Sequence, residues 1–156
     1  MPDPKSKYWF PVRETMDPGI REQKILERVQ EVMTYAYKKS VFYRNKWDEA
    51  GVHPEHISSL DDFERVPVVT KQELRAAQLR VEPFGDYLCV PEREVHHIHG
   101  TSGTTGRPTV FAIGREDWRT IAENQARILW AMGLRPSDMV FVAAIFGLYL
   151  GSWGAM

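Results

Sequence analysis

The sequence has little cysteine, no excess of charge of either sign and no long apolar run. Cys89 is its one cysteine in 156 residues, which excludes an internal disulfide framework and a cysteine-rich zinc module. The 20 Lys and Arg side chains balance 21 Asp and Glu, and this net charge of −1 argues against nucleic acid or an anionic membrane as the main partner. No apolar stretch reaches the ~18 residues of a membrane span, and the start, MPDPKSKYWF, lacks the pattern of a signal peptide. We therefore expect a cytoplasmic protein.

What the sequence does contain, in its first half, is a series of helix signals. Apolar residues between positions 20 and 40 recur every three or four residues and predict one long amphipathic helix. A shorter helix is expected over 42–50, ended by Gly51. Ser59 and Thr70 each precede a short helical segment as N-cap residues. The sequence therefore predicts a helical N-terminal cap over residues 1–83.

The second half changes character and predicts strands. Residues 95–99 and 109–113 are short and β-branched or bounded by turn residues, which favours two strands. A helix is expected over 115–132, closed by Gly133, and the apolar run 139–146 is expected to be a strand covered on both faces. This order indicates an α/β class, with residues 84–156 as the start of an incomplete α/β domain.

The most informative segment joins the two predicted strands and reads GTSGTTGRP over residues 100–108. Its glycines allow main-chain N–H groups to approach a ligand, its hydroxyls can donate to anionic oxygens, and Arg107 adds a permanent positive charge. Together they predict a nest for phosphate. The spacing fits neither a Walker loop nor the dinucleotide fingerprint. The alternative is a hairpin turn that is merely rich in small residues.

Several motifs in order resemble one family. The segment Ser102–Pro108 is similar to the phosphate-binding loop of the adenylate-forming (AMP-binding) superfamily of acyl-CoA synthetases. The phenylacetate–CoA ligase branch is the closer match, through the elements Phe42-Tyr43-Arg44, Ser59-Leu60-Asp61-Asp62-Phe63, Pro67 with Thr70-Lys71, and Pro108-Thr109-Val110. The branch usually has lysine where this chain has Arg107, which keeps the charge and changes its hydrogen-bond geometry.

This resemblance implies a two-step ligase. A carboxylate attacks the α-phosphate of ATP, with Mg²⁺, to give an acyl-adenylate and pyrophosphate, and coenzyme A then displaces AMP to give a thioester. The phosphate- and ATP-binding residues that it implies are Thr101, Ser102, Gly103, Thr104, Thr105, Gly106 and Arg107. The acyl pocket that it implies includes Ala144, Phe146, Gly147 and Tyr149, for which ordinary core packing is the alternative.

The resemblance also limits what this chain is expected to do. Ala144 stands where the family often has tyrosine, so we expect an aryl or longer acyl substrate rather than phenylacetate itself. The family's later motifs have no counterpart, so no catalytic residue is expected in these residues, which we interpret as the truncated N-terminal part of a ligase that is inactive alone. The alternative is a non-catalytic module that binds nucleotide or a partner.

Two further interpretations concern metals and partners. His97 and His99 share one face of the predicted strand and could begin a zinc site, but no cysteine or acid nearby completes it, so no metal site is expected. The predicted partners are nucleotide and carboxylic acid. A homodimer contact, if one forms, is expected at the cap helices or at the apolar C-terminal end.

Overall fold

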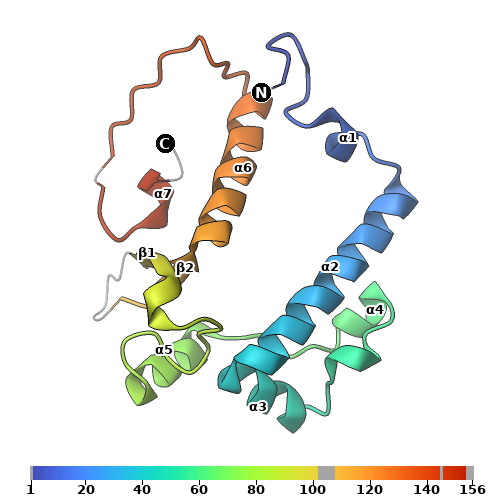
Figure 1. Cartoon of the computed structure of the whole chain (residues 1–156), viewed down its shortest axis with the longest axis vertical. Helices are drawn as coiled ribbons and strands as arrows, with labels where there is room; N and C mark the ends of the chain where they lie inside the picture. The colour runs from blue at the N-terminus through green and yellow to red at the C-terminus, as the bar shows by residue number, and fades with distance from the viewer. Residues whose placement is uncertain (1, 102–107, 145, 154–156) are drawn as a thin grey trace. The chain divides into compact units, whose positions relative to one another are not determined.

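The computed structural model describes residues 2–101, 108–144 and 146–153 (Figure 1). The chain forms two compact units, one of Asp17–Arg93 and one of Met1–Met16 with Glu94–Met156. We call them the helical unit and the hairpin unit and describe each by itself. The units are defined by contacts within the chain, and the boundary expected after residue 83 between a cap and an α/β domain stays a prediction.

The helical unit confirms the predicted helices. They are α2 (Pro18–Lys39), α3 (Val41–Glu49), α4 (Leu60–Phe63) and α5 (Lys71–Arg80), with a short 3₁₀ helix η1 (Pro54–His56) between α3 and α4. Gly51 follows α3 with a φ of 67°, the left-handed conformation that ends a helix at little cost for glycine.

The core of the helical unit lies where α2 meets α3 and η1. Met33 and Ala36 of α2 pack with Trp47 of α3 and with Ile57, which follows η1. Tyr37 stacks on Trp47 with the ring centroids 6.4 Å apart. Burial of this apolar and aromatic surface is what holds these amphipathic helices together.

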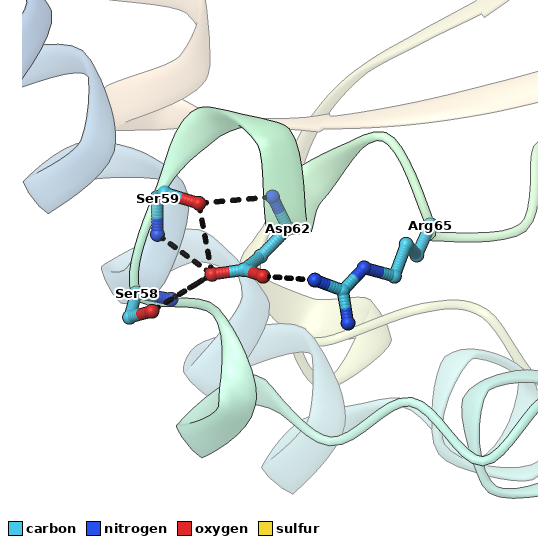
Figure 2. A network of polar contacts seen from close by, with 4 residues as sticks. All are labelled: Ser58, Ser59, Asp62 and Arg65. Atoms are coloured by element: carbon cyan, nitrogen blue, oxygen red, sulfur yellow. Dashed lines mark hydrogen bonds and ion pairs between the residues drawn. The ribbon is translucent and has the colours of Figure 1, made fainter.

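Short helices in this unit depend on capping boxes, and Figure 2 shows the more elaborate of the two. Ser59 accepts a hydrogen bond from the Asp62 N–H at 3.1 Å. The Asp62 carboxylate in return accepts the N–H groups of Ser58 and Ser59, both at 3.0 Å, and the hydroxyls of both serines, and it pairs with Arg65. The hydrogen bonds from the two serines lower the pKa of Asp62 from 3.8 to about 2, because they stabilise the ionised form.

The second capping box starts α5. Thr70 caps the helix, and Glu73 accepts the Thr70 N–H at 2.7 Å. Glu73 also pairs with Lys46 of α3. The lysine first and then the threonine lower the pKa of Glu73 from 4.5 to about 2. The box thus ties α5 to α3 as well as starting the helix.

The hairpin unit is built on strands β1 (Val95–Gly100) and β2 (Val110–Gly114), which confirms both predicted strands. They pair antiparallel, with His99 opposite Phe111 and Gly100 opposite Val110. Helix α6 (Arg115–Ala131) follows β2 directly and contacts both strands. Gly133, with a φ of 96°, lies just beyond its end, as predicted.

The far end of α6 is held by the first residues of the chain. The indole of Trp130 is buried and donates to the Ser6 carbonyl at 3.0 Å. The ring of Trp9 meets that of Trp130 edge to face, with centroids 5.5 Å apart. The unit also contains the single-turn helices α1 (Pro11–Glu14) and α7 (Leu150–Trp153), and the 3₁₀ helix η2 (Glu92–Glu94) spans the point where the two units meet in sequence.

One predicted element is wrong. The described residues between 139 and 146 form no helix or strand, and Met139 and Phe141 are 98% and 91% exposed. An apolar run becomes a buried strand only when neighbouring strands accept its backbone hydrogen bonds and helices cover its faces. The sheet in the described part of the chain has only β1 and β2, so this run has neither.

Among the described helices none is long and apolar enough to cross a membrane.

Acid should weaken the fold through Asp62. Because its folded pKa is depressed, its stabilising contribution is complete above about pH 4 and is lost as the pH falls toward about pH 2. We expect Asp62→Asn to lower the melting temperature at neutral pH and to show a smaller further loss on acidification, with Glu73 still contributing its own share. Thermal unfolding followed by circular dichroism between about pH 7 and about pH 3 measures this. The matched control is Asp61→Asn, and equal acid sensitivity of both variants would contradict the prediction.

Candidate functional site

The candidate site begins where the glycine- and hydroxyl-rich loop leaves the hairpin. The Thr101 N–H donates to the Thr109 carbonyl at 3.0 Å, and the Thr109 N–H donates to the Thr101 hydroxyl oxygen at 3.2 Å. Thr109 is 1% exposed. These two bonds clamp the ends of the loop together. The predicted phosphate ligands Ser102, Gly103, Thr104, Thr105, Gly106 and Arg107 lie outside the described residues, so their role stays a prediction.

Thr101 therefore has a task that the sequence did not reveal. Its side-chain oxygen accepts a hydrogen bond from the buried Thr109 N–H and closes the hairpin. The sequence pointed to Thr101 only as a hydrogen-bond donor to phosphate. A hydroxyl can accept and donate at once, so its O–H remains able to donate elsewhere. The prediction that Thr101 also contacts ATP is compatible with the clamp but is not tested by it.

A second contact joins the loop to a distant part of the chain. The Leu148 carbonyl accepts the Gly100 N–H at 2.7 Å and contacts His99 Nδ1 at 3.2 Å. Consecutive N–H groups of a strand point to opposite sides, and that of Thr101 points toward β2, so the Gly100 bond lies on the outer edge of β1. A Cβ placed on Gly100 would lie only 3.7 Å from that of Leu148.

This contact brings together two predicted groups that are far apart in sequence. Leu148 lies within the predicted acyl-pocket segment Phe146–Tyr149, and Gly100 precedes the residues of the predicted phosphate loop. Phe146 and Tyr149 are 41% and 58% exposed, so neither ring is part of a core within the described residues. Phe146 meets Trp153 edge to face, with centroids 5.5 Å apart, and the Trp153 indole donates to the Gly147 carbonyl at 2.8 Å. Ala144 is also exposed. Contact of these residues with an acid stays a prediction.

Next to this contact lies a cluster of histidine and tryptophan rings. Trp118, in the first turn of α6, stacks on His97 with centroids 3.9 Å apart and on His99 at 5.6 Å, with the latter rings only 7° from parallel. Trp153 approaches both histidines at 6.5 and 6.4 Å. Within the described residues no group of three histidine, cysteine or acidic side chains is placed to hold a metal ion.

The sequence indicates His99 only as a possible zinc ligand, and the structure gives its ring a different contact. Its ring is 3% exposed, Nδ1 meets the Leu148 carbonyl, and Nε2 is buried without a hydrogen-bond partner in the described structure, as is the hydroxyl of Thr109. The spacing of His97 and His99 by two residues indicated that both side chains lie on the same face of a strand. The partner of His99, however, lies 49 residues away and could not be found from local pattern.

Comparisons with curated proteins give a consistent set of relatives. The chain is 41% identical over 128 residues to phenylacetate-coenzyme A ligase of Thermus thermophilus and 40% identical over 129 residues to that of Escherichia coli. These matches cover 82% and 83% of this chain and 28% of each relative. The chain thus spans little more than a quarter of the length of the curated relatives it matches. No protein-family model matches the chain.

Comparisons with solved structures agree. The chain superposes on a crystal structure of 2-hydroxyisobutyryl-CoA ligase, in complex with 2-HIB-AMP and CoA, with a TM-score of 0.94 and 59% identity. An open conformation of the same ligase gives 0.93 and 57%. Each match covers 99% of this chain, and 33% and 36% of the ligase chains. Sequence and structure together confirm the resemblance drawn from the motifs, with this chain matching an N-terminal part of such a protein.

The clamp at the base of the loop should be measurable as stability. Thr101→Val removes the oxygen that accepts the Thr109 N–H and leaves that buried group unpaired, which should cost about 1–3 kcal/mol of the free energy of unfolding. Thr101→Ser keeps the hydroxyl and should stay close to the wild type. Urea unfolding of both variants tests this. A valine variant as stable as the serine variant would show that the bond does not hold the loop ends.

Proposed function

We propose, from its relationship to the phenylacetate–coenzyme A ligases, that this chain supplies the phosphate-binding loop and part of the acyl pocket of an ATP-dependent carboxylate–CoA ligase. The reaction converts carboxylate, ATP and coenzyme A to acyl-CoA, AMP and pyrophosphate through an acyl-adenylate. The observation that best supports this proposal is the Leu148 carbonyl, which joins the base of the glycine-rich loop to the predicted acyl segment. A ligase needs its nucleotide phosphates and its acid side by side.

Within this proposal each part of the site has a physical task. The Thr101–Thr109 clamp holds the ends of the loop on a rigid hairpin. From there the amides and hydroxyls of residues 102–106 would surround the β- and γ-phosphates, and Arg107 would neutralise charge on the departing pyrophosphate. We assign no catalytic residue to this chain. The groups that would bind Mg²⁺ and coenzyme A are expected from residues other than these 156.

The acid that is activated is a separate question, and two classes are supported. The structural relatives named for 2-hydroxyisobutyryl-CoA are 56–59% identical to this chain, against 36–41% for the curated relatives named for phenylacetate. That difference favours a small branched 2-hydroxy acid. The small side chain of Ala144 favours instead an aryl or longer acyl acid, which needs more room. We name the 2-hydroxy acid as the first candidate and an aryl or longer acyl acid bulkier than phenylacetate as the second.

The alternative function is a module that binds nucleotide or a partner protein without catalysis. It would use the same loop, so binding alone does not separate the two proposals. Turnover does, since only a ligase exchanges pyrophosphate into ATP when an acid is present.

The ligase proposal predicts acid-dependent exchange. With the complete polypeptide that contains residues 1–156, we expect labelled pyrophosphate to enter ATP only when a carboxylic acid is added, and more rapidly with 2-hydroxyisobutyrate than with phenylacetate or a longer acid. Arg107→Ala should weaken the exchange, while Arg107→Lys keeps the charge and should retain more of it. Exchange with none of these acids would contradict the ligase proposal. A preference for phenylacetate would overturn both assignments of the acid.

The same proposal predicts that residues 1–156 are inactive alone. Incubated with ATP, Mg²⁺, coenzyme A and either acid, they should form no thioester, because the groups that complete the site would be missing. Chromatography of acyl-CoA products measures this, with the complete polypeptide as the positive control. Thioester formed by residues 1–156 would contradict the proposal that the remaining groups of the site come from other residues.

A further inference from the structure

We propose that His99 is a positioning residue for the acid: its Nδ1–H holds the Leu148 carbonyl and thereby fixes the segment Phe146–Tyr149 against the base of the phosphate loop. The inference rests on the proposed ligase function. It goes beyond it by giving a task to a side chain that stands outside the loop and outside the acyl segment.

The chemistry of the contact determines which form of the ring is present. A carbonyl oxygen only accepts hydrogen bonds, so the contact at 3.2 Å requires a proton on His99 Nδ1. The same carbonyl has a second lone pair, which takes the Gly100 N–H at 2.7 Å. One oxygen therefore receives a side-chain donor and a main-chain donor from consecutive residues of β1. The backbone bond alone would leave the segment free to pivot about it, and the histidine removes that freedom.

The ring itself is held rigidly. Trp118 of α6 lies nearly parallel to it at 5.6 Å, His97 lies on the same strand at 5.9 Å, and only 3% of the residue is exposed. A donor held in this way loses little rotamer freedom when it binds its acceptor. Its other nitrogen, Nε2, is buried with no partner in the described residues, so the ring's placement satisfies one nitrogen only. Hydrogen bonding at Nδ1 is thus the one polar contact of the ring that the structure shows.

The position of this contact predicts which substrate it affects. Gly147 and Tyr149 flank Leu148, Phe146 precedes Gly147, and these three are the residues proposed to contact the acid. Gly100 and the clamped Thr101 are already fixed by pairing with β2. Loss of the histidine donor should therefore loosen the acyl segment and leave the loop base in place. The KM for the acid should rise while the KM for ATP stays unchanged.

Two near-isosteric substitutions separate the nitrogens. In His99→Asn the amide nitrogen takes the place of Nδ1, and in His99→Gln it takes the place of Nε2. In pyrophosphate exchange by the complete polypeptide, we expect His99→Gln to raise the KM for the acid by up to about 10-fold, the loss of one hydrogen bond, and His99→Asn to restore it toward the wild type. His96→Asn and His96→Gln are the matched controls, because the His96 side chain is exposed on the same strand.

A second readout reports on the contact without turnover. Hydrogen exchange at the Gly100 amide should accelerate in His99→Gln and stay slow in His99→Asn, because that amide shares the Leu148 carbonyl. Equal behaviour of the two variants in both measurements would overturn the inference. So would a rise in the KM for ATP equal to that for the acid. If no acid supports exchange even in the wild type, the ligase proposal fails, and the Gly100 amide still decides whether His99 holds Leu148.

Discussion

The hairpin unit depends on how the outer edge of β1 is satisfied. A two-stranded hairpin pairs one edge of each strand and leaves the other edge with unpaired main-chain groups. In this chain the Leu148 carbonyl lies at that edge and accepts a hydrogen bond from the Gly100 N–H. The same carbonyl contacts Nδ1 of the His99 ring. The first residues of the glycine-rich segment, the predicted acyl segment and the ring cluster of His97, His99, Trp118 and Trp153 lie around this one carbonyl. It relates segments that the sequence separates by nearly 50 residues.

The sequence predicted the local part of the fold well because local rules determine it. The 3.6-residue periodicity located α2 and α6, the serine and threonine N-caps located α4 and α5, and glycine marked the ends of α3 and α6. It failed over residues 139–146, because hydrophobic composition does not say whether neighbouring strands are present. The phosphate-binding loop was predicted from composition, and residues 102–107 lie outside the described residues, so that role stays a prediction. The Thr101–Thr109 clamp and the contact of His99 with Leu148 join residues that no local pattern relates, so they needed the structure.

The helical unit uses a different means of holding its parts. Its short helices α4 and α5 are too small to be stable by propensity alone, so each begins with a box of reciprocal hydrogen bonds to an ionised acid. Glu73 extends this by pairing with Lys46 of α3. The packed core around Trp47 supplies the apolar contact, and the acids set where each helix starts. Ionised side chains therefore stabilise the helix starts, and apolar burial stabilises the helix faces.

The clamp at Thr101 and Thr109 has a consequence for how the loop can change over evolutionary time. Because the hydrogen bonds that close the hairpin lie outside residues 102–107, the identity and number of those residues are not what sets the pairing register of β1 and β2. We therefore expect substitution or insertion within residues 102–107 to leave the strand pairing in place. A hairpin closed in this way allows the sequence of the loop to vary while the strands on either side of it stay paired.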